Sequence, residues 1–255
     1  MTIREILEQL ASGELSVGQA ESRLAIAGIS ALEGFAQLDT GRHARKGVPE
    51  VVYAAGKTPG QLAEICRSML DHTGRAIVSG LDRERWVALE DSFKEKLAVA
   101  SREAGMAVIR KPGREPKATG GRLGILTAGT SDIPAAEQAR IVAEEMGCKV
   151  IAAYDVGVAG VHRLKEPLEQ MIGSGIAALI VAAGMEGALP SVVAGLVPVP
   201  VIGLPTSTGY GLGGKGVTAL LAMLQSCCPG LVVVNIDNGI GAGATAALIA
   251  NRACT

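Results

Sequence analysis

Aromatic side chains are scarce in this chain, which has one Trp, three Tyr and two Phe among its 255 residues. Proteins that bind single-stranded nucleic acid usually stack bases on aromatic rings, so this scarcity argues against such a role. The formal net charge is −1, which provides no electrostatic attraction to nucleic acid or to an anionic membrane. We therefore expect neither nucleic acid nor a membrane as a partner.

Long apolar runs and paired cysteines are also lacking. The longest candidate for a membrane span, residues 176–183, has the length of a strand and ends at Gly184. The N-terminal segment MTIREILEQL carries charges within its apolar pattern and does not match a signal peptide. The five cysteines are odd in number, and their spacing fits no zinc site. We expect reduced thiols and a cytoplasmic protein.

Glycine, by contrast, is abundant, with 34 residues that are concentrated in the second half of the chain. Glycine allows the backbone to approach a ligand closely, so this asymmetry is a first indication of where a binding site lies. Hydrophobic residues make up 48% of the chain, which indicates a globular protein with enough length for one large or two smaller domains.

The first half, residues 1–115, predicts a helical hairpin followed by a small α+β domain. The hairpin covers roughly the first 30 residues, with a break near Gly13 and a cap at Ser16. A polar, basic stretch follows at residues 39–46. After it we expect strands at residues 50–54, 75–79 and 107–110, and helices at residues 58–71 and 82–100.

Residues 111–121 read as a linker, and residues 118–255 form the second predicted domain. Expected strands are residues 122–127, 149–154, 177–183, 199–204 and 231–235. Expected helices are residues 134–146, 165–172, 186–194, 216–226 and 245–252. The strands are almost wholly apolar, which is typical of strands covered on both faces. The fold class is therefore α/β: a doubly wound parallel sheet in three αβα layers, with a smaller N-terminal α+β domain.

Glycine and hydroxyl residues follow each of these five strands, at the edge where open parallel sheets bind ligands. The loops contribute Gly129, Thr130, Ser131, Asp132, Asp155, His162, Arg163, Gly184, Met185, Glu186, Gly187, Thr206, Ser207, Asp237 and Asn238. Free N–H groups at helix N-termini suit phosphate. Any single loop is equally well explained as an ordinary helix cap or tight turn. All five at one edge favour a nucleotide-type ligand.

The sequences of these loops resemble the nickel-pincer cofactor biosynthesis protein family LarB. The resemblance rests on GTSDIPAAEQA, YDVGVAGVHRL, AAGMEGALPSVVAGLVPVPVIGLPTSTGYG and LQSCCPGLVVVNIDNGIGAG, and on LDTGRHARKGVPEVVYAAGKT in the first half. The second half is also similar to the PurE type of aminoimidazole ribonucleotide carboxylase. PurE-type enzymes carry a catalytic histidine where this chain has Ala188, and here Glu186 stands two residues earlier.

The resemblance implies a synthase that acts on nicotinic acid adenine dinucleotide. It would carboxylate the pyridinium ring at C5 with CO2 or bicarbonate as co-substrate and hydrolyse the phosphoanhydride. The products would be pyridinium-3,5-biscarboxylic acid mononucleotide and AMP, the first step towards a nickel-pincer nucleotide. Mg²⁺ on the phosphates would assist hydrolysis, although no spacing in the sequence indicates a metal site. PurE-like domains assemble as octamers, so we expect a homo-oligomer, namely an octamer.

The family motifs place the nucleophile at Cys227 and the acid/base at Glu186. Cys228 is a second thiol in the same turn, and either cysteine also fits a small buried hydrophobe. Cys227 lies near the end of a predicted helix, at the edge of the sheet opposite the loops. Either that helix boundary is misplaced or the site takes residues across a subunit contact. Glu186 also fits an early-turn helix residue favoured by the helix dipole.

Several other residues have two interpretations each. Asp132 can cap its helix or hold a metal or ribose, and His162 can be a core residue or, with Arg163, a phosphate contact. In the first half, Asp39, Arg42, Arg45, Glu50 and Lys57 match the family motif. They form either a solvated charged face or, through the three cations, a surface for the adenylate side of the substrate.

Two other functions remain open from the sequence. One is a carboxylase or mutase acting on aminoimidazole ribonucleotide, which Ala188 disfavours. The other is a non-catalytic nucleotide-binding module, which would bind a dinucleotide without incorporating carbon dioxide and would not depend on Cys227.

Overall fold

The computed structural model describes residues 3–27, 29–32 and 36–254. The chain divides into two compact units, the first formed by Met1–Ala100 and Met106–Glu115 and the second by Ser101–Gly105 and Pro116–Thr255. Within the described residues, no helix is long and apolar enough to cross a membrane.

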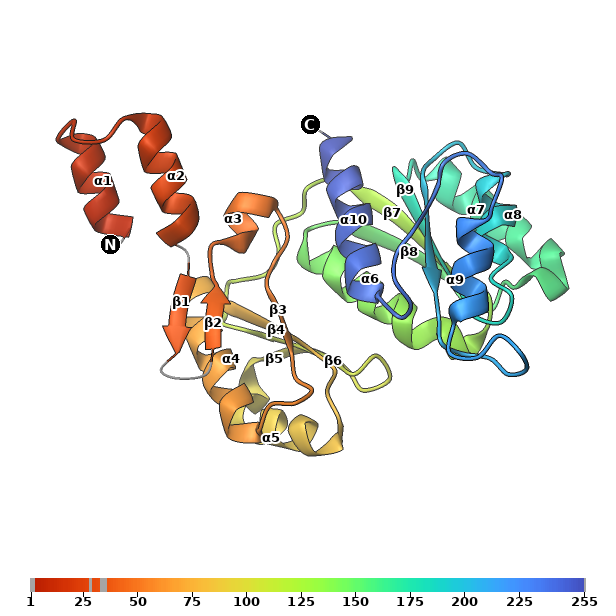
Figure 1. Ribbon diagram of the computed structural model, residues 1–255, viewed down its shortest axis with the longest axis horizontal. Helices are drawn as coiled ribbons and strands as arrows, with labels where there is room; N and C mark the ends of the chain where they lie inside the picture. Colours follow the sequence, from red (N-terminus) through yellow and green to blue (C-terminus); the bar gives the residue numbers. More distant parts are fainter. Residues whose placement is uncertain (1–2, 28, 33–35, 255) are drawn as a thin grey trace. The chain divides into compact units, whose positions relative to one another are not determined.

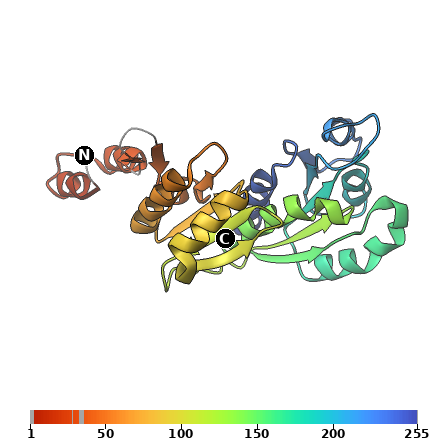
Figure 2. The same cartoon turned by 90° about the horizontal axis from the view of Figure 1, so that it is seen from below.

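The first unit begins with a helical hairpin, which Figure 1 shows in red and Figure 2 shows from below. Its helices are α1 (Ile3–Ala11) and α2 (Val17–Ala27), and their small shared core centres on Ile6, Leu15 and Ala20. The predicted hairpin is therefore present. Two short antiparallel strands follow, β1 (Ile29–Leu32) and β2 (Ala36–Asp39), where the sequence pattern had indicated no strands.

The rest of the first unit is a four-stranded sheet with three helices. Its elements are α3 (Arg42–Lys46), β3 (Val51–Tyr53), α4 (Pro59–Thr73), β4 (Arg75–Ser79), α5 (Arg83–Phe93), β5 (Leu97–Ser101) and β6 (Met106–Arg110), and the strand order is β3-β4-β6-β5. Strand β4 pairs parallel to β3 and antiparallel to β6. The strands predicted at residues 50–54, 75–79 and 107–110 are thus β3, β4 and β6.

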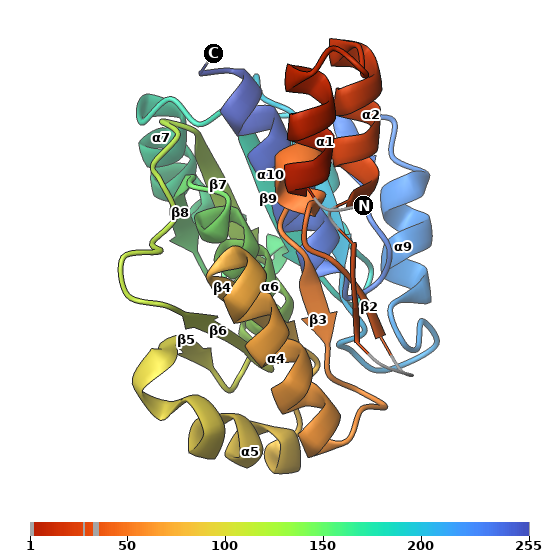
Figure 3. The same cartoon turned by 90° about the vertical axis from the view of Figure 1, so that its left-hand side faces the viewer.

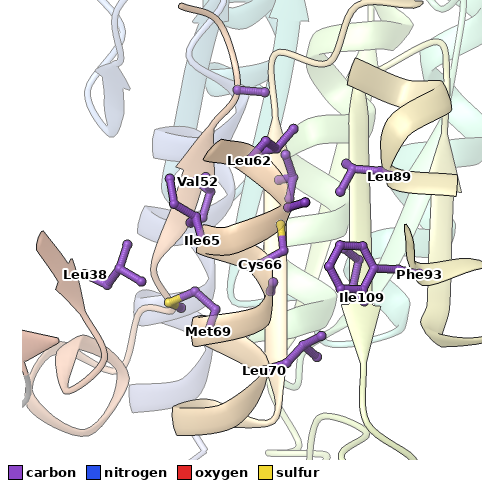
Figure 4. Packing of buried hydrophobic residues seen from close by; sticks show 14 residues of the cluster. Leu38, Val52, Leu62, Ile65, Cys66, Met69, Leu70, Leu89, Phe93 and Ile109 are labelled. Atoms are coloured by element: carbon purple, nitrogen blue, oxygen red, sulfur yellow. The ribbon is translucent and has the colours of Figure 1, made fainter. Parts of the chain in front are cut away.

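Helix α4 begins where the sequence places a capping box. The Thr58 hydroxyl accepts from the Gln61 N–H at 3.2 Å, the Gln61 side chain accepts from the Thr58 N–H at 3.0 Å, and Pro59 occupies the first turn. The helix lies across the sheet (Figure 3). Figure 4 shows its apolar side chains packed against Leu89 and Phe93 of α5 and Ile109 of β6, which makes this the core of the first unit.

The helix predicted at residues 82–100 was wrong in its last part. Helix α5 ends at Phe93, a single 3-10 turn covers Lys94–Lys96, and Leu97–Ser101 forms β5. Burial alternates along β5, so Leu97 and Val99 are half-buried between exposed alanines. Such two-residue periodicity is typical of a strand with one face on a core, and pairing with β6 stabilises it over a helix.

The second unit is a doubly wound parallel α/β domain, as predicted. Its elements are β7 (Arg122–Thr127), α6 (Ile133–Glu145), β8 (Lys149–Ala153), α7 (Lys165–Gly173), β9 (Ala178–Ala183), α8 (Leu189–Ala194), β10 (Val201–Pro205), α9 (Val217–Leu224), β11 (Leu231–Val233) and α10 (Gly239–Arg252). The strand order is β11-β10-β9-β7-β8, and every pairing is parallel. All five predicted strands are present.

Helices cover both faces of this sheet. Helices α7, α8 and α9 share one apolar core with the strands, whereas α6 and α10 pack against each other and against β7 and β9 (Figure 1). The contact between α6 and α10 is built from Ala and Gly. A Cβ on Gly243 would lie 2.3 Å from the Ala139 carbonyl oxygen, so only glycine allows this close approach.

Two helix boundaries in the second unit differ from the predictions. The helix predicted from residue 186 begins at Leu189, because Met185 and Gly187 have positive φ and cannot enter a right-handed helix. The last helix begins at Gly239 rather than residue 245, where the Asn238 side chain accepts from the Gly241 N–H at 2.8 Å and caps it.

Candidate functional site

Backbone strain is concentrated at the carboxyl edge of the parallel sheet. Among the described residues, four other than glycine have positive φ: Asp155 (59°), Met185 (52°), Lys215 (57°) and Asp237 (56°). They lie in the loops that follow β8, β9, β10 and β11 respectively. Such conformations cost about 1–3 kcal/mol each and occur mainly at functional sites. The strain therefore marks the edge at which the sequence had predicted ligand binding.

A cavity of about 510 Å³ opens at this edge, a volume within the range of small-molecule sites. The loops after β7, β8, β9 and β10 line it. The predicted residues that line it are Gly129, Ser131, Asp132, Asp155, Arg163, Gly184, Met185 and Glu186. Its lining also includes Ala188, Thr208, Gly209 and Tyr210, which the sequence interpretation had not assigned to a binding role.

The remaining residues predicted from these loops do not line the cavity; they are Thr130, His162, Gly187, Thr206, Ser207, Asp237 and Asn238. Asp237 accepts from the Ser207 N–H at 2.8 Å, and Asn238 caps α10. These contacts join the loops after β10 and β11 and begin the last helix. Four of the five loops predicted to bind a ligand therefore line the cavity, and the loop after β11 does not. His162 is exposed, which excludes the core interpretation for it.

Asp132 is the best-connected carboxylate of the cavity, with only 4% of its surface exposed. Its Oδ1 accepts from the hydroxyls of Thr206 at 2.5 Å and Thr208 at 2.7 Å, and its Oδ2 accepts from the Gly129 N–H at 2.9 Å. These three bonds tie the loop after β7 to the loop after β10. The Asp132 carboxylate therefore has a structural role: its hydrogen bonds hold the two loops together.

Asp155 and Arg163 form an ion pair on another side of the cavity. The Arg163 guanidinium lies 3.0 Å from Asp155 Oδ2, and the Asp155 N–H donates to the buried Thr127 hydroxyl at 3.0 Å. The bond to Thr127 holds Asp155 in its left-handed conformation directly after β8. Arg163 is half-exposed and remains accessible to an anionic ligand, with its charge partly balanced by Asp155.

Glu186 differs from these residues because its carboxylate is exposed and has no ionic or hydrogen-bond partner within the described part of the chain. It lies outside helix α8, so the early-turn interpretation was wrong. Gly184 fixes the turn that precedes it: a Cβ there would lie 2.3 Å from the Thr208 carbonyl oxygen. Glu186 is thus an exposed carboxylate that lines the cavity.

The two adjacent cysteines do not reach this cavity. Helix α9 ends at Leu224, and residues 227 and 228 lie in the turn that leads to the amino end of β11. Cys227 is exposed, whereas Cys228 is half-buried and its thiol donates to the Ser191 carbonyl oxygen at 3.2 Å. Neither thiol lines the cavity. The observed helix end lies two residues before the predicted one, too small a change to bring Cys227 to the opposite edge.

The charged motif of the first unit is paired internally. Arg45 binds Asp39 at 2.5 Å, Arg42 binds Glu50 at 2.6 Å, and Lys57 donates to the Tyr53 carbonyl oxygen at 2.7 Å. The two ion pairs connect helix α3 to the end of β2 and to the residue before β3. Each of the three cations assigned to the adenylate side therefore has a partner within its own unit.

Within the described residues, no group of three or more His, Cys, Asp or Glu side chains is arranged to hold a metal ion. Mg²⁺ is commonly bound through substrate phosphates with only one or two carboxylates. The described residues therefore offer no ready-made set of protein ligands for a metal ion.

The second unit is thus a parallel α/β domain of the PurE-like type, with a cavity at the carboxyl edge of its sheet. Comparison with known families identifies residues 122–255, more than half of the chain, as AIR carboxylase, and residues 30–111 as a LarB/PurE-like N-terminal domain. The chain therefore belongs to the AIR carboxylase family and has the two-domain architecture of LarB.

Relatives support this membership. An uncharacterised protein of Methanocaldococcus jannaschii is 42% identical over 97% of this chain and 96% of its own length. The N5-carboxyaminoimidazole ribonucleotide mutases of M. jannaschii and Thermotoga maritima are 34% and 31% identical, over 49% and 50% of this chain and 74% of each mutase. The mutases thus match about half of this chain, whereas the first relative matches both halves.

Proposed function

We propose that this protein carboxylates the pyridinium ring of nicotinic acid adenine dinucleotide at C5 and hydrolyses the phosphoanhydride. The products are pyridinium-3,5-biscarboxylic acid mononucleotide and AMP, and CO2 derived from bicarbonate is the co-substrate. The observation that carries the proposal is the unpartnered Glu186 carboxylate at the cavity, two residues before Ala188, the position at which PurE-type enzymes have a histidine.

A pyridinium ring is electron-poor and does not attack CO2 directly, so a nucleophile must first add to it. Addition of the Cys227 thiolate beside C5 forms a carbon–sulfur bond and converts the cation into a neutral enamine. The enamine electron pair at C5 then forms the bond to CO2. Glu186 removes the C5 proton, and departure of the thiolate restores the aromatic cation. The sum is replacement of the C5 hydrogen by a carboxylate, with release of one proton.

Cys227 acts in this scheme from a second copy of the chain. Its thiol is exposed beyond the end of α9, where a neighbouring subunit can approach it, while the cavity of its own chain is lined without cysteine. Cys228 fits the nucleophile less well, because its thiol is half-buried and bonded to Ser191. The proposed assembly is a homo-oligomer, and an octamer is the form expected for a PurE-like domain.

Hydrolysis of the phosphoanhydride is the second part of the proposed reaction. Water attacks phosphorus and AMP leaves with the bridging oxygen. Mg²⁺ bound to the two phosphates would neutralise their charge. Arg163 is the cation among the residues that line the cavity, and Arg42, Arg45 and Lys57 are proposed for the adenylate side. Their present partners, Glu50, Asp39 and a carbonyl oxygen, would then be exchanged for phosphate oxygens.

The test is mass spectrometry of the products formed from nicotinic acid adenine dinucleotide, bicarbonate and Mg²⁺. We expect a doubly carboxylated mononucleotide and AMP from the wild type and from Cys228→Ser, and neither from Cys227→Ser or Glu186→Gln. Absence of carboxylated product from the wild type would refute the proposal, and aminoimidazole ribonucleotide would be the next substrate to test. Dinucleotide binding without turnover, unaffected by Cys227→Ser, would indicate a non-catalytic binding module.

A mixing experiment tests the sharing of the site between subunits. Cys227→Ser and Glu186→Gln chains are each inactive, but a co-expressed mixture contains some sites with both native residues. If the two side chains come from different copies, random assembly restores on the order of a quarter of the sites. If both residues act within one chain, every chain lacks one of them and the mixture stays inactive.

A further inference from the structure

Tyr210 is an aromatic side chain at the cavity that the proposed reaction leaves unused. It belongs to the glycine-rich loop between β10 and α9, lines the cavity, and has 84% of its surface exposed. The chain contains only six aromatic residues, and Tyr210 is the one among the lining residues of this cavity. Burial of a tyrosine ring normally stabilises a protein or a complex, so an uncovered ring at the rim of a cavity can pack against a bound ligand.

The backbone before Tyr210 is firmly anchored. The Thr208 hydroxyl is bonded to Asp132, and the Thr208 carbonyl oxygen accepts from the Met185 N–H at 3.2 Å. Gly209 follows with φ of 132°, and a Cβ on it would lie 2.9 Å from the Met185 sulfur. Tyr210 therefore extends from a fixed point next to the turn that carries Glu186.

The backbone after Tyr210 is unconstrained by comparison. Gly211 has φ of 84°, and a Cβ on it would meet no atom within 4 Å. Leu212 is fully exposed. Tyr210 thus stands between an anchored glycine and one with open space around it, and its ring lies at the cavity largely uncovered.

The charges around the cavity favour a cationic ring as that ligand. Arg163 is paired with Asp155, and the oxygens of Asp132 are occupied by three donors, which leaves Glu186 as the carboxylate without a partner. A free carboxylate and an uncovered aromatic face together attract an aromatic cation, because the face of the ring carries negative electrostatic potential. A neutral ring of the same shape would be attracted less strongly by the carboxylate and by the aromatic face.

We infer that Tyr210 stacks on the cationic ring of the substrate and selects a pyridinium over a neutral ring. This inference rests on the proposed function and names the residue that gives it specificity for charge. Tyr210 contributes through the face of its ring, so Tyr210→Phe retains the selection and Tyr210→Leu loses it. Glu186 contributes to the same selection through its charge.

The experiment compares the binding of nicotinic acid adenine dinucleotide with that of its reduced form, whose dihydropyridine ring is neutral, by calorimetric titration of the full chain. Wild type and Tyr210→Phe should prefer the oxidised form, and Tyr210→Leu should lower that preference about five- to tenfold by weakening binding of the cationic form. Leu212→Ala, in the same loop but away from the cavity lining, is the matched control and should leave the preference unchanged. Glu186→Gln should reduce the preference while Tyr210 is intact.

The outcomes separate this inference from the proposed function. If Tyr210→Leu weakens the binding of both redox forms equally, or if Leu212→Ala has the same effect as Tyr210→Leu, then Tyr210 only shapes the loop and does not distinguish a charged ring from a neutral one. The inference is then overturned while the proposed reaction stands. If the wild type binds neither form and yields no product, the proposed function falls and the inference falls with it. If the preference for the oxidised dinucleotide is lost in Tyr210→Leu and Glu186→Gln and kept in the other variants, the result supports both the inference and the proposed function.

Discussion

Replacing Asp132 with alanine removes the one acceptor that three donors share. In the native protein its carboxylate accepts from Thr206, Thr208 and the Gly129 N–H, and only 4% of the residue is exposed. A hydrogen bond to a charged partner contributes roughly 1.5–3 kcal/mol to stability. The two hydroxyls are 2.8 Å apart, so in the variant one can donate to the other and recover part of the loss.

We therefore expect Asp132→Ala to lower the free energy of unfolding of the second unit by about 3 kcal/mol, since two donors remain without acceptors. Asp132→Asn keeps an acceptor for the two hydroxyls but turns an amide N–H towards the Gly129 N–H. It should cost about half as much, on the order of 1–2 kcal/mol. Typical domains are stable by about 5–15 kcal/mol, so both losses are measurable without abolishing folding.

Urea unfolding followed by far-ultraviolet circular dichroism is the assay. Trp86, the single tryptophan, lies in the first unit, so its fluorescence follows that unit separately. Ser131→Ala is the matched control: Ser131 neighbours Asp132, is exposed, and makes no hydrogen bond through its side chain among the described residues. A loss below about 1 kcal/mol for Asp132→Ala, or an equal loss for Ser131→Ala, would refute the reasoning.

Three further predictions concern packing, reactivity and pH. Gly243→Ala should destabilise the protein by about 2 kcal/mol in urea unfolding, because the added Cβ would meet a backbone carbonyl oxygen. Gly173→Ala is the control and should be neutral or stabilising, because open space surrounds Gly173. Equal effects of the two substitutions would contradict the packing argument. Burial raises the pKa of Cys66 to about 12, so in the native protein iodoacetamide should alkylate the exposed Cys227 and Cys254 before Cys66. Peptide mass spectrometry that finds Cys66 labelled as fast as Cys227 would contradict this expectation. Burial raises the pKa of Glu137, but hydrogen bonds from a neighbouring arginine and tyrosine outweigh it and hold the pKa below its usual 4.5. The ionised carboxylate therefore stabilises the folded state, and the wild type should lose this free energy of unfolding as the pH falls below 4.5, whereas Glu137→Gln should not. Parallel plots of stability against pH for the two proteins would disprove the stabilising role of Glu137.

The sequence alone was sufficient for the architecture of the second unit. Continuous apolar runs such as residues 177–183 indicate strands buried on both faces, and the glycine and hydroxyl residues after them mark the edge at which the cavity lies. In the first unit the same reasoning found β3, β4, β6 and α4. These features are local, because they depend on the periodicity and capping chemistry of adjacent residues.

Three strands and the paired charges were not predictable in this way. The residues of β1, β2 and β5 lay in segments for which no strand was predicted, and pairing with a neighbouring strand decides their conformation more than their own composition does. Arg42 and Arg45 match the family motif in the sequence, but the sequence did not show that each forms an ion pair with a carboxylate of its own unit. Which charges meet depends on how the chain folds back on itself.

The sequence by itself determined that this is a LarB-like α/β protein with a binding edge, because strand runs, turn residues and motifs are properties of neighbours along the chain. Only the tertiary structure decided that Asp132 holds two loops together, that Glu186 has no partner among the described residues, and that Cys227 does not line the cavity of its own chain. Hydrogen-bond partners, exposure and the lining of a cavity arise from segments distant in sequence that approach in space. No local pattern of residues encodes them.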